Sequence, residues 1–162
     1  GKSSRLYRAL VSENSLALEV DAAYSMLSRD PGLFSVFAQP LPGKTAENVL
    51  AAVERELEKV KRELVTEQEL QKAKNQLEAS FIFGQDSLFY QAMLLAQHEI
   101  CGGWNQINHY VEGIRKITAR DVRKAARTYL RRDNRTTGIL VPEKIKKPPA
   151  PEKSPLGPQI MR

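Results

Sequence analysis

The two histidines and the single cysteine are the side chains of this sequence best suited to bind a metal ion. Glu99 follows His98, but the zinc motif HExxH would need a second imidazole where the chain has Gly102. The inverted motif, HxxEH, would need a carboxylate at Cys101 and an imidazole at Gly102. His109 lies beyond a Gly-Gly break and extends neither pattern. The sequence therefore predicts no metal-binding, cofactor-binding or catalytic residue, and we expect both histidines at the surface or at helix ends.

Nucleophilic catalysis and phosphate binding are also poorly supported. The sequence has no Gly-x-Ser-x-Gly motif. Cys101 lies three residues after His98, so the two could touch on a helix, but a half-buried thiol before a Gly-Gly stop is the simpler interpretation. Gly1-Lys2-Ser3 matches the end of a P-loop, whereas a helix cap by Ser3 or Ser4 explains the same residues. The lone cysteine excludes an internal disulfide.

A basic stripe near the C-terminal end is the remaining candidate for binding chemistry. Its members recur at spacings of three and four, which places them on one helix face: Arg120, Arg123, Lys124, Arg127 and Arg131. Such a face could follow a phosphate backbone, or bind an anionic protein or peptide. However, the opposite face is apolar, so an amphipathic helix packed on a core would have the same pattern. The stripe has no interleaved aromatic residues, and we treat nucleic-acid binding as a subordinate alternative.

The elements that must position these residues begin with a β-hairpin at residues 16–39. A turn at Arg29-Asp30-Pro31-Gly32 separates two apolar stretches, of which the second runs from Leu33 to Gln39. A period of two in the first stretch predicts a strand with one face toward a core. The residues expected on that face are Leu16, Leu18, Val20, Ala22, Tyr24 and Met26. We predict an antiparallel hairpin.

The chain from the hairpin to residue 131 has helical periodicity, in segments that begin at capping residues. Thr66 and Glu69 form a predicted capping box, in which Glu69 reaches back to the Thr66 amide. The helix from Leu88 to Ile100 is apolar around much of its circumference, so we expect it to be central and covered by its neighbours. Thr136 to Val141 is typical of a short final strand. The other predicted caps are Ser3 or Ser4, Thr45, Asp86-Ser87 and Thr118.

The order of elements predicts an α+β fold, with an antiparallel-type sheet covered on one face by helices. The chain of 162 residues has room for one domain with a sizeable core, and its 41% hydrophobic and 27% charged residues are typical of a globular protein. No apolar run approaches the roughly 20 residues that a membrane helix needs, so we expect no membrane partner. We predict a partial α+β domain without a metal site at residues 1–141. A Pro/Lys-rich linker toward a next domain is expected at 142–162.

Three segments, in this order and spacing, resemble the insulinase, pitrilysin and mitochondrial-processing-peptidase family of zinc endopeptidases. The first is Gly1 to Val11 with the alternating strand after it. The second and most distinctive is Val65-Thr66-Glu67-Gln68-Glu69-Leu70-Gln71-Lys72-Ala73-Lys74. The third runs from Tyr110 through Ile117-Thr118-Ala119-Arg120-Asp121-Val122 to Pro142. The resemblance implies a clamshell of paired α+β domains that closes around an unfolded peptide.

The resemblance also implies which parts of the family's machinery this chain lacks. The family's zinc is held by a HxxEH motif and a distal Glu on another domain, so zinc is expected in the parent protein and not in this chain. A further domain of the family carries an Arg and a Tyr seven residues apart, where this chain has Val11 and Leu18. Neither side chain can donate a hydrogen bond to a developing oxyanion. The chain therefore resembles the domain without catalytic residues, lacking that domain's opening strands.

The leading hypothesis is a non-catalytic, substrate-enclosing domain of a zinc metalloendopeptidase, inactive by itself. Its expected partners are the other domains of the same peptidase and an unfolded peptide substrate. One alternative is a scaffold member of the same family that has lost proteolysis, in which case the zinc motif of the parent would be absent. The second is the nucleic-acid-binding module built on Arg120 to Arg131.

Self-association is the prediction that follows from the missing opening strands. The remaining sheet should expose an unpaired edge, which invites pairing with a second copy of the chain. Light scattering at high protein concentration should therefore report dimers or larger species. A mass that stays monomeric at every concentration would contradict this expectation.

Overall fold

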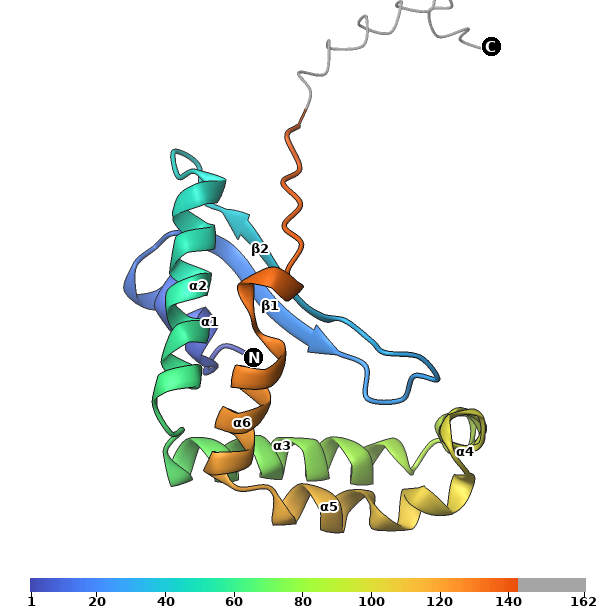
Figure 1. Ribbon diagram of the computed structural model, residues 1–162. Helices are drawn as coiled ribbons and strands as arrows, with labels where there is room; N and C mark the ends of the chain where they lie inside the picture. Colours follow the sequence, from blue (N-terminus) through green and yellow to red (C-terminus); the bar gives the residue numbers. More distant parts are fainter. Residues whose placement is uncertain (143–162) are drawn as a thin grey trace, which may run out of the picture.

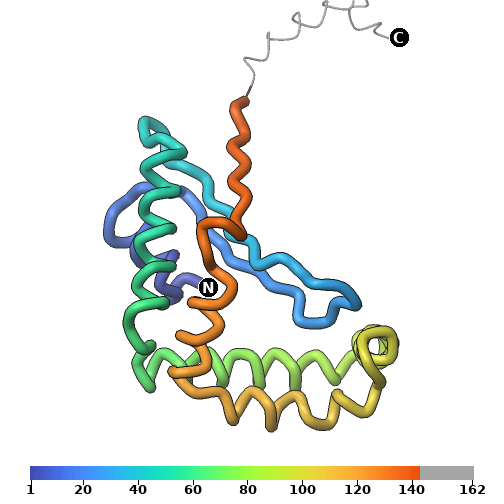
Figure 2. The backbone as a smooth tube through the Cα atoms, viewed as in Figure 1, coloured from blue at the N-terminus to red at the C-terminus, as the bar shows by residue number. Residues whose placement is uncertain are grey.

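The computed structural model describes residues 1–142, so nearly all of the predicted linker at 142–162 lies outside the described residues. The described chain combines one antiparallel hairpin with helices (Figure 1), and Figure 2 traces the same path as a tube. The elements, in chain order, are α1 (Arg5–Tyr7), the π-helical turn η1 (Arg8–Glu13), β1 (Ala17–Tyr24), β2 (Phe34–Pro40), α2 (Ala46–Arg62), α3 (Glu67–Gly84), α4 (Leu88–Cys101), the 3-10 helix η2 (Trp104–His109), α5 (Tyr110–Lys116), α6 (Ala119–Tyr129) and η3 (Arg132–Asn134).

The β-hairpin predicted for residues 16–39 is confirmed, since β1 and β2 pair antiparallel with Val20 opposite Ala38. A bulge between Ala17 and Glu19 interrupts the alternation at the start of β1. Ala17 is only 1% exposed, whereas Leu18 is 58% exposed. The prediction that Leu18 faces the core is therefore wrong, because a bulge inserts one extra residue and reverses the facing of its neighbours.

One face of the hairpin is covered by helices, as predicted, and this contact forms the core. Leu10 of η1 is completely buried, and its carbonyl accepts a hydrogen bond from the Leu16 amide at 2.8 Å. Tyr24 and Met26, at the other end of the hairpin, remain more than half exposed because η1 and α2, which cover the core, do not reach them. The buried cluster consists of Leu10, Ala17, Val20, Val49, Ala52 and Val53.

The helices α3, α4, η2 and α5, residues 67–116, form a unit that we call the arm. Within the arm α3 and α5 lie side by side, and α4 is at the end far from α2 (Figure 1). The expectation that α4 is central is wrong, since Leu88, Phe89 and Ile100 are 82%, 78% and 70% exposed. An apolar circumference shows that a helix needs cover, but it does not determine which segment supplies it. Of the described residues of α4, His98 alone is buried.

The final strand predicted at Thr136 to Val141 is absent from the described structure, in which the sheet has two strands. Leu140 is 94% exposed, so this apolar segment lies against no neighbouring strand. A strand needs a partner for its backbone groups, and β propensity alone does not provide one. Both outer edges of the hairpin are likewise unpaired among residues 1–142. Within the same range, no helix combines the length and the apolar character needed to cross a membrane.

The predicted helix starts are confirmed at the level of individual hydrogen bonds. Ser4, Thr45 and Ser87 each accept a bond from the backbone amide three residues on. Thr118 does the same, and its own amide donates the reciprocal bond to the Asp121 carboxylate in a complete capping box. The predicted Gly-Gly stop after α4 is also confirmed, because Gly102 adopts a φ of +146°, which side chains with a Cβ rarely allow.

Truncation of Leu10, at the centre of the core, should destabilise the fold more than truncation of an exposed leucine. Leu10→Ala removes a fully buried side chain, so we expect the free energy of unfolding to fall by about 2–5 kcal/mol in urea titrations. Leu18→Ala, which removes the same atoms from an exposed position, should cost less than about 1 kcal/mol. Equal losses in the two variants would contradict the burial pattern at the bulge.

Candidate functional site

The positions where related domains carry an Arg and a Tyr do not form a polar site here. Val11 packs against the core cluster, and Leu18 is exposed at the bulge. His109 is exposed at the end of η2, and Cys101 is half-buried at the end of α4. Among residues 1–142, no group of three or more His, Cys, Asp or Glu side chains is placed to hold a metal ion. The donor set described here does not fit a zinc site.

The basic stripe on α6 is partly used to hold the fold together. Arg127 donates its Nε hydrogen to the Lys61 carbonyl at 2.7 Å, near the C-terminal end of α2. Arg131 pairs with Asp133 at 3.3 Å. Arg120 and Lys124 are exposed. Nucleic-acid binding by this stripe stays a prediction. Two of its five cations, Arg127 and Arg131, already have partners within the domain.

A hollow of about 230 Å³ lies between the hairpin and the arm. One wall is the connection that follows β1, and the others come from α3, α4 and α5. Its lining combines apolar and aromatic side chains with hydroxyl, amide and imidazole groups. The lining residues are Ser25, Met26, Leu27, Leu77, Ser80, Phe81, Tyr90, Leu94, Gln97, His98 and Tyr110. A concave apolar surface with a few polar groups is the arrangement typical of binding sites.

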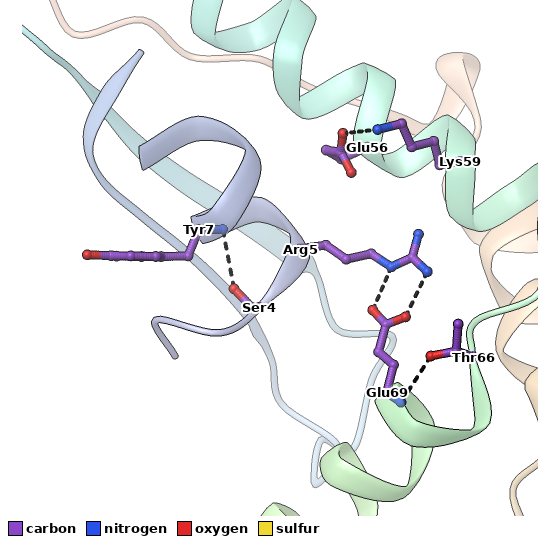
Figure 3. A network of polar contacts seen from close by, with 7 residues as sticks. All are labelled: Ser4, Arg5, Tyr7, Glu56, Lys59, Thr66 and Glu69. Atoms are coloured by element: carbon purple, nitrogen blue, oxygen red, sulfur yellow. Dashed lines mark hydrogen bonds and ion pairs between the residues drawn. The ribbon is translucent and has the colours of Figure 1, made fainter. Parts of the chain in front are cut away.

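The arm is anchored to the N-terminal helix by a bidentate ion pair (Figure 3). Arg5 Nε lies 2.5 Å from Glu69 Oε1, and Arg5 Nη2 lies 2.7 Å from Glu69 Oε2. The hydrogen bond from Arg5 lowers the pKa of Glu69, and the same bond raises the pKa of Arg5. This geometry gives two parallel charge-assisted bonds across 64 residues of sequence.

The predicted capping box at the start of α3 is only half formed. Thr66 Oγ1 accepts the Glu69 amide at 3.2 Å, so the cap itself is confirmed. The Glu69 carboxylate, which was expected to return to the Thr66 amide, binds Arg5 through both of its oxygens (Figure 3). The Thr66 amide still lowers the pKa of Glu69, but by less than the bond from Arg5, because a guanidinium offers two bonds and a full charge.

The inside of the arm is fixed by contacts between α3 and α5. Arg115 donates to both carboxylate oxygens of Glu78 through its Nε and Nη2, with Nε 3.1 Å from Glu78 Oε2. Lys74 donates to the Arg115 carbonyl at 2.9 Å. The rings of Phe81 and Tyr110 lie 4.9 Å apart at the base of the hollow, tilted by 36°. Burial raises the pKa of Tyr110, and the neighbouring Tyr90 adds a smaller effect. These aromatic walls are therefore held in place from outside the hollow.

His98 is the histidine whose burial the sequence did not indicate. It lies near the end of α4 as expected, but it is only 4% exposed and lines the hollow. Its Nδ1 is 2.9 Å from the Leu94 carbonyl, one turn earlier in α4. Tyr90, Leu94 and His98 recur every four residues, and this spacing could have indicated a shared inward face. The pair Arg5–Glu69 had no comparable signal, because its members are distant in sequence.

Comparison with known proteins identifies the family. The peptidase M16 inactive domain matches residues 1–77. The inactive peptidase domain of a candidate zinc protease from Bordetella parapertussis is 28% identical, with a TM-score of 0.79 over 95% of this chain and 79% of that one. A candidate zinc protease from Bordetella pertussis Tohama I is 29% identical, with a TM-score of 0.78 over 88% of this chain and 78% of that one. Residues 1–77 thus match the inactive domain of the peptidase M16 family, and the fold matches that of a solved inactive peptidase domain.

Both matches are to domains of the non-catalytic kind, as the resemblance in sequence implied. An uncharacterised zinc protease of Streptomyces coelicolor is 30% identical over 133 residues, which make up 82% of this chain. The chain spans 28% of the length of that relative. The α+β architecture predicted from sequence is confirmed by the same structural neighbours.

Removal of the Arg5–Glu69 pair should weaken the M16 domain in a pH-dependent way. At pH 7, Glu69→Gln should lower the free energy of unfolding by about 1 kcal/mol, near the upper end for a partly exposed ion pair. The pKa of Glu69 is lowered on folding, so its contribution is complete above the ordinary value of 4.5. That contribution is lost as the pH falls through the lowered pKa.

Urea titrations between pH 7 and pH 3 measure this difference. The stability of the parent domain and of Glu69→Gln should converge in acid. Glu13→Gln, at the exposed pair of Glu13 with Arg8, is the matched control and should change stability by less. A constant gap between parent and Glu69→Gln at all pH values would show that the ionised pair is not the cause.

Proposed function

We propose that this M16 domain encloses unfolded peptide substrate in a zinc metalloendopeptidase whose catalytic residues lie on another domain. The observation that carries the proposal is the likeness to an inactive peptidase domain over 95% of the chain. The donor set of residues 1–142 does not fit zinc, which agrees with a division of labour between domains. In this proposal zinc is held by the parent protein outside this chain.

The surface around the hollow suits an unfolded peptide. Tyr24 and Phe34 are cross-strand neighbours near the end of the hairpin, and they are 61% and 46% exposed. Met26 and Leu33, in the connection between the strands, are exposed as well. Unfolded peptides offer apolar side chains and free backbone groups, which such a surface and an unpaired strand edge can bind. The domain would contribute by orienting the peptide and restricting its motion, while bond cleavage takes place elsewhere.

Peptide binding without turnover is the expected outcome for the purified chain. A fluorescein-labelled unfolded peptide should show a rise in anisotropy on titration, while its chromatogram shows no cleavage and metal analysis finds no stoichiometric zinc. The double variant Tyr24→Ser, Phe34→Ser should weaken binding about tenfold, which corresponds to about 1.4 kcal/mol. Leu140→Ser, which alters an exposed apolar residue outside the hairpin, is the matched control.

Three outcomes would contradict the proposal. Turnover of the peptide with zinc retained in equimolar amount would make the domain catalytic. An unchanged anisotropy would remove the enclosing role. A parent protein that binds peptide without cleaving it, and has no zinc motif, would favour the scaffold alternative.

A further inference from the structure

The hollow between the hairpin and the arm is large enough to hold one aromatic ring. Its volume is about 230 Å³, and an apolar cavity of about 150 Å³ in another protein is large enough to bind benzene. Its walls come from separate parts of the chain: Met26 belongs to the hairpin connection, Leu77 to α3, and Leu94 to α4. No Lys, Arg, Asp or Glu lines it among the described residues, so a charged side chain would enter without a compensating partner.

The aromatic walls are positioned by packing. Phe81 and Tyr110 meet at 4.9 Å, a separation typical of interacting rings. The ring of Tyr90 lies so close to Gly84 that a Cβ there would collide with it. The absence of a side chain at Gly84 therefore allows Tyr90 to take its place beside the hollow.

The imidazole of His98 gives the hollow one directional polar group. The residue is only 4% exposed, and its Nδ1 lies 2.9 Å from the Leu94 carbonyl. A carbonyl only accepts, so Nδ1 carries the proton and Nε2 of the neutral ring is an acceptor. Nε2 has no hydrogen-bond partner among residues 1–142. In the same range, every side-chain nitrogen that is fully buried has a partner, so Nε2 is not fully buried. Nε2 therefore retains accessible surface, and the hollow is the space that His98 lines.

We propose that the hollow binds the phenol side chain of a tyrosine from the peptide, with its hydroxyl donating to His98 Nε2. This inference rests on the proposed function, because it names the side chain that an enclosed peptide would insert. The ring would contact Leu77, Phe81 and Leu94, and the hydroxyl would give Nε2 the partner that it lacks. Phenylalanine would fill the same space but leave Nε2 unpaired, which penalises its binding relative to tyrosine.

Titration of the full chain with two small probes tests this choice. N-acetyl-tyrosinamide and N-acetyl-phenylalaninamide differ only by the hydroxyl, and ¹H–¹⁵N spectra locate and quantify their binding. We expect the tyrosine probe to bind about tenfold more tightly, which is the usual net effect of one hydrogen bond. Shift changes should centre on residues 25–27, Leu77 and His98, and the His98 Nε2 nitrogen resonance should move with the tyrosine probe.

Two variants separate the hydrogen bond from the cavity. His98→Asn keeps a donor for the Leu94 carbonyl and removes Nε2, so the preference for tyrosine should fall to about one while phenylalanine binding is retained. Ser80→Phe fills the hollow from an exposed position and should weaken both probes. Leu88→Ala, at an exposed site of α4 outside the lining, should change neither.

The results that would overturn the inference differ from those that would overturn the proposed function. Equal affinities for the two probes, or shift changes away from the hollow, would remove the tyrosine site. A tyrosine preference that persists in His98→Asn would do the same. If the unfolded peptide still raises the anisotropy in either case, the enclosing role stands without this site.

Discussion

A two-stranded hairpin is at best marginally stable by itself, and the fold depends on the cover that η1 and α2 give to one of its faces. Leu10 is at the centre of this contact, where it is completely buried between the strand and the helix. The same constraint explains the bulge at the start of β1. Ala17 is small enough to lie under η1, and the extra residue directs Leu18 outward.

The arm is held to this core by polar links at its base. The pair Arg5–Glu69 joins α1 to the first turn of α3. The bond from Arg127 to the Lys61 carbonyl joins α6, the helix that follows the arm, to the end of α2, the helix that precedes it. These contacts fix where α3 begins, and therefore how far the distant end of the arm lies from the hairpin. The hollow is a consequence of that spacing, because its walls come from the hairpin connection and from the helices of the arm.

The exposed apolar surface of this domain is extensive. Leu88 and Phe89 on α4, Leu140 in the C-terminal segment and Leu33 in the hairpin connection all lie largely in solvent. Exposed apolar groups that cluster on a domain commonly mark surfaces that other protein segments cover. This agrees with the proposal that the chain works together with other domains of the same protein. The apolar circumference of α4 is therefore explained if another protein segment covers this helix.

Sequence alone determined the features that depend on near neighbours: the hairpin at residues 16–39, the caps at Thr45 and Thr118, and the family. Alternation and capping act over one to four residues, so their outcome is readable from spacing. The candidate site was not predicted, because its parts meet only after folding. Tertiary structure decided that Glu69 binds Arg5, that His98 is buried, and that no strand forms at Thr136 to Val141. Each of these outcomes depends on which distant group offers the stronger bond or the better cover, and local spacing carries no information about that.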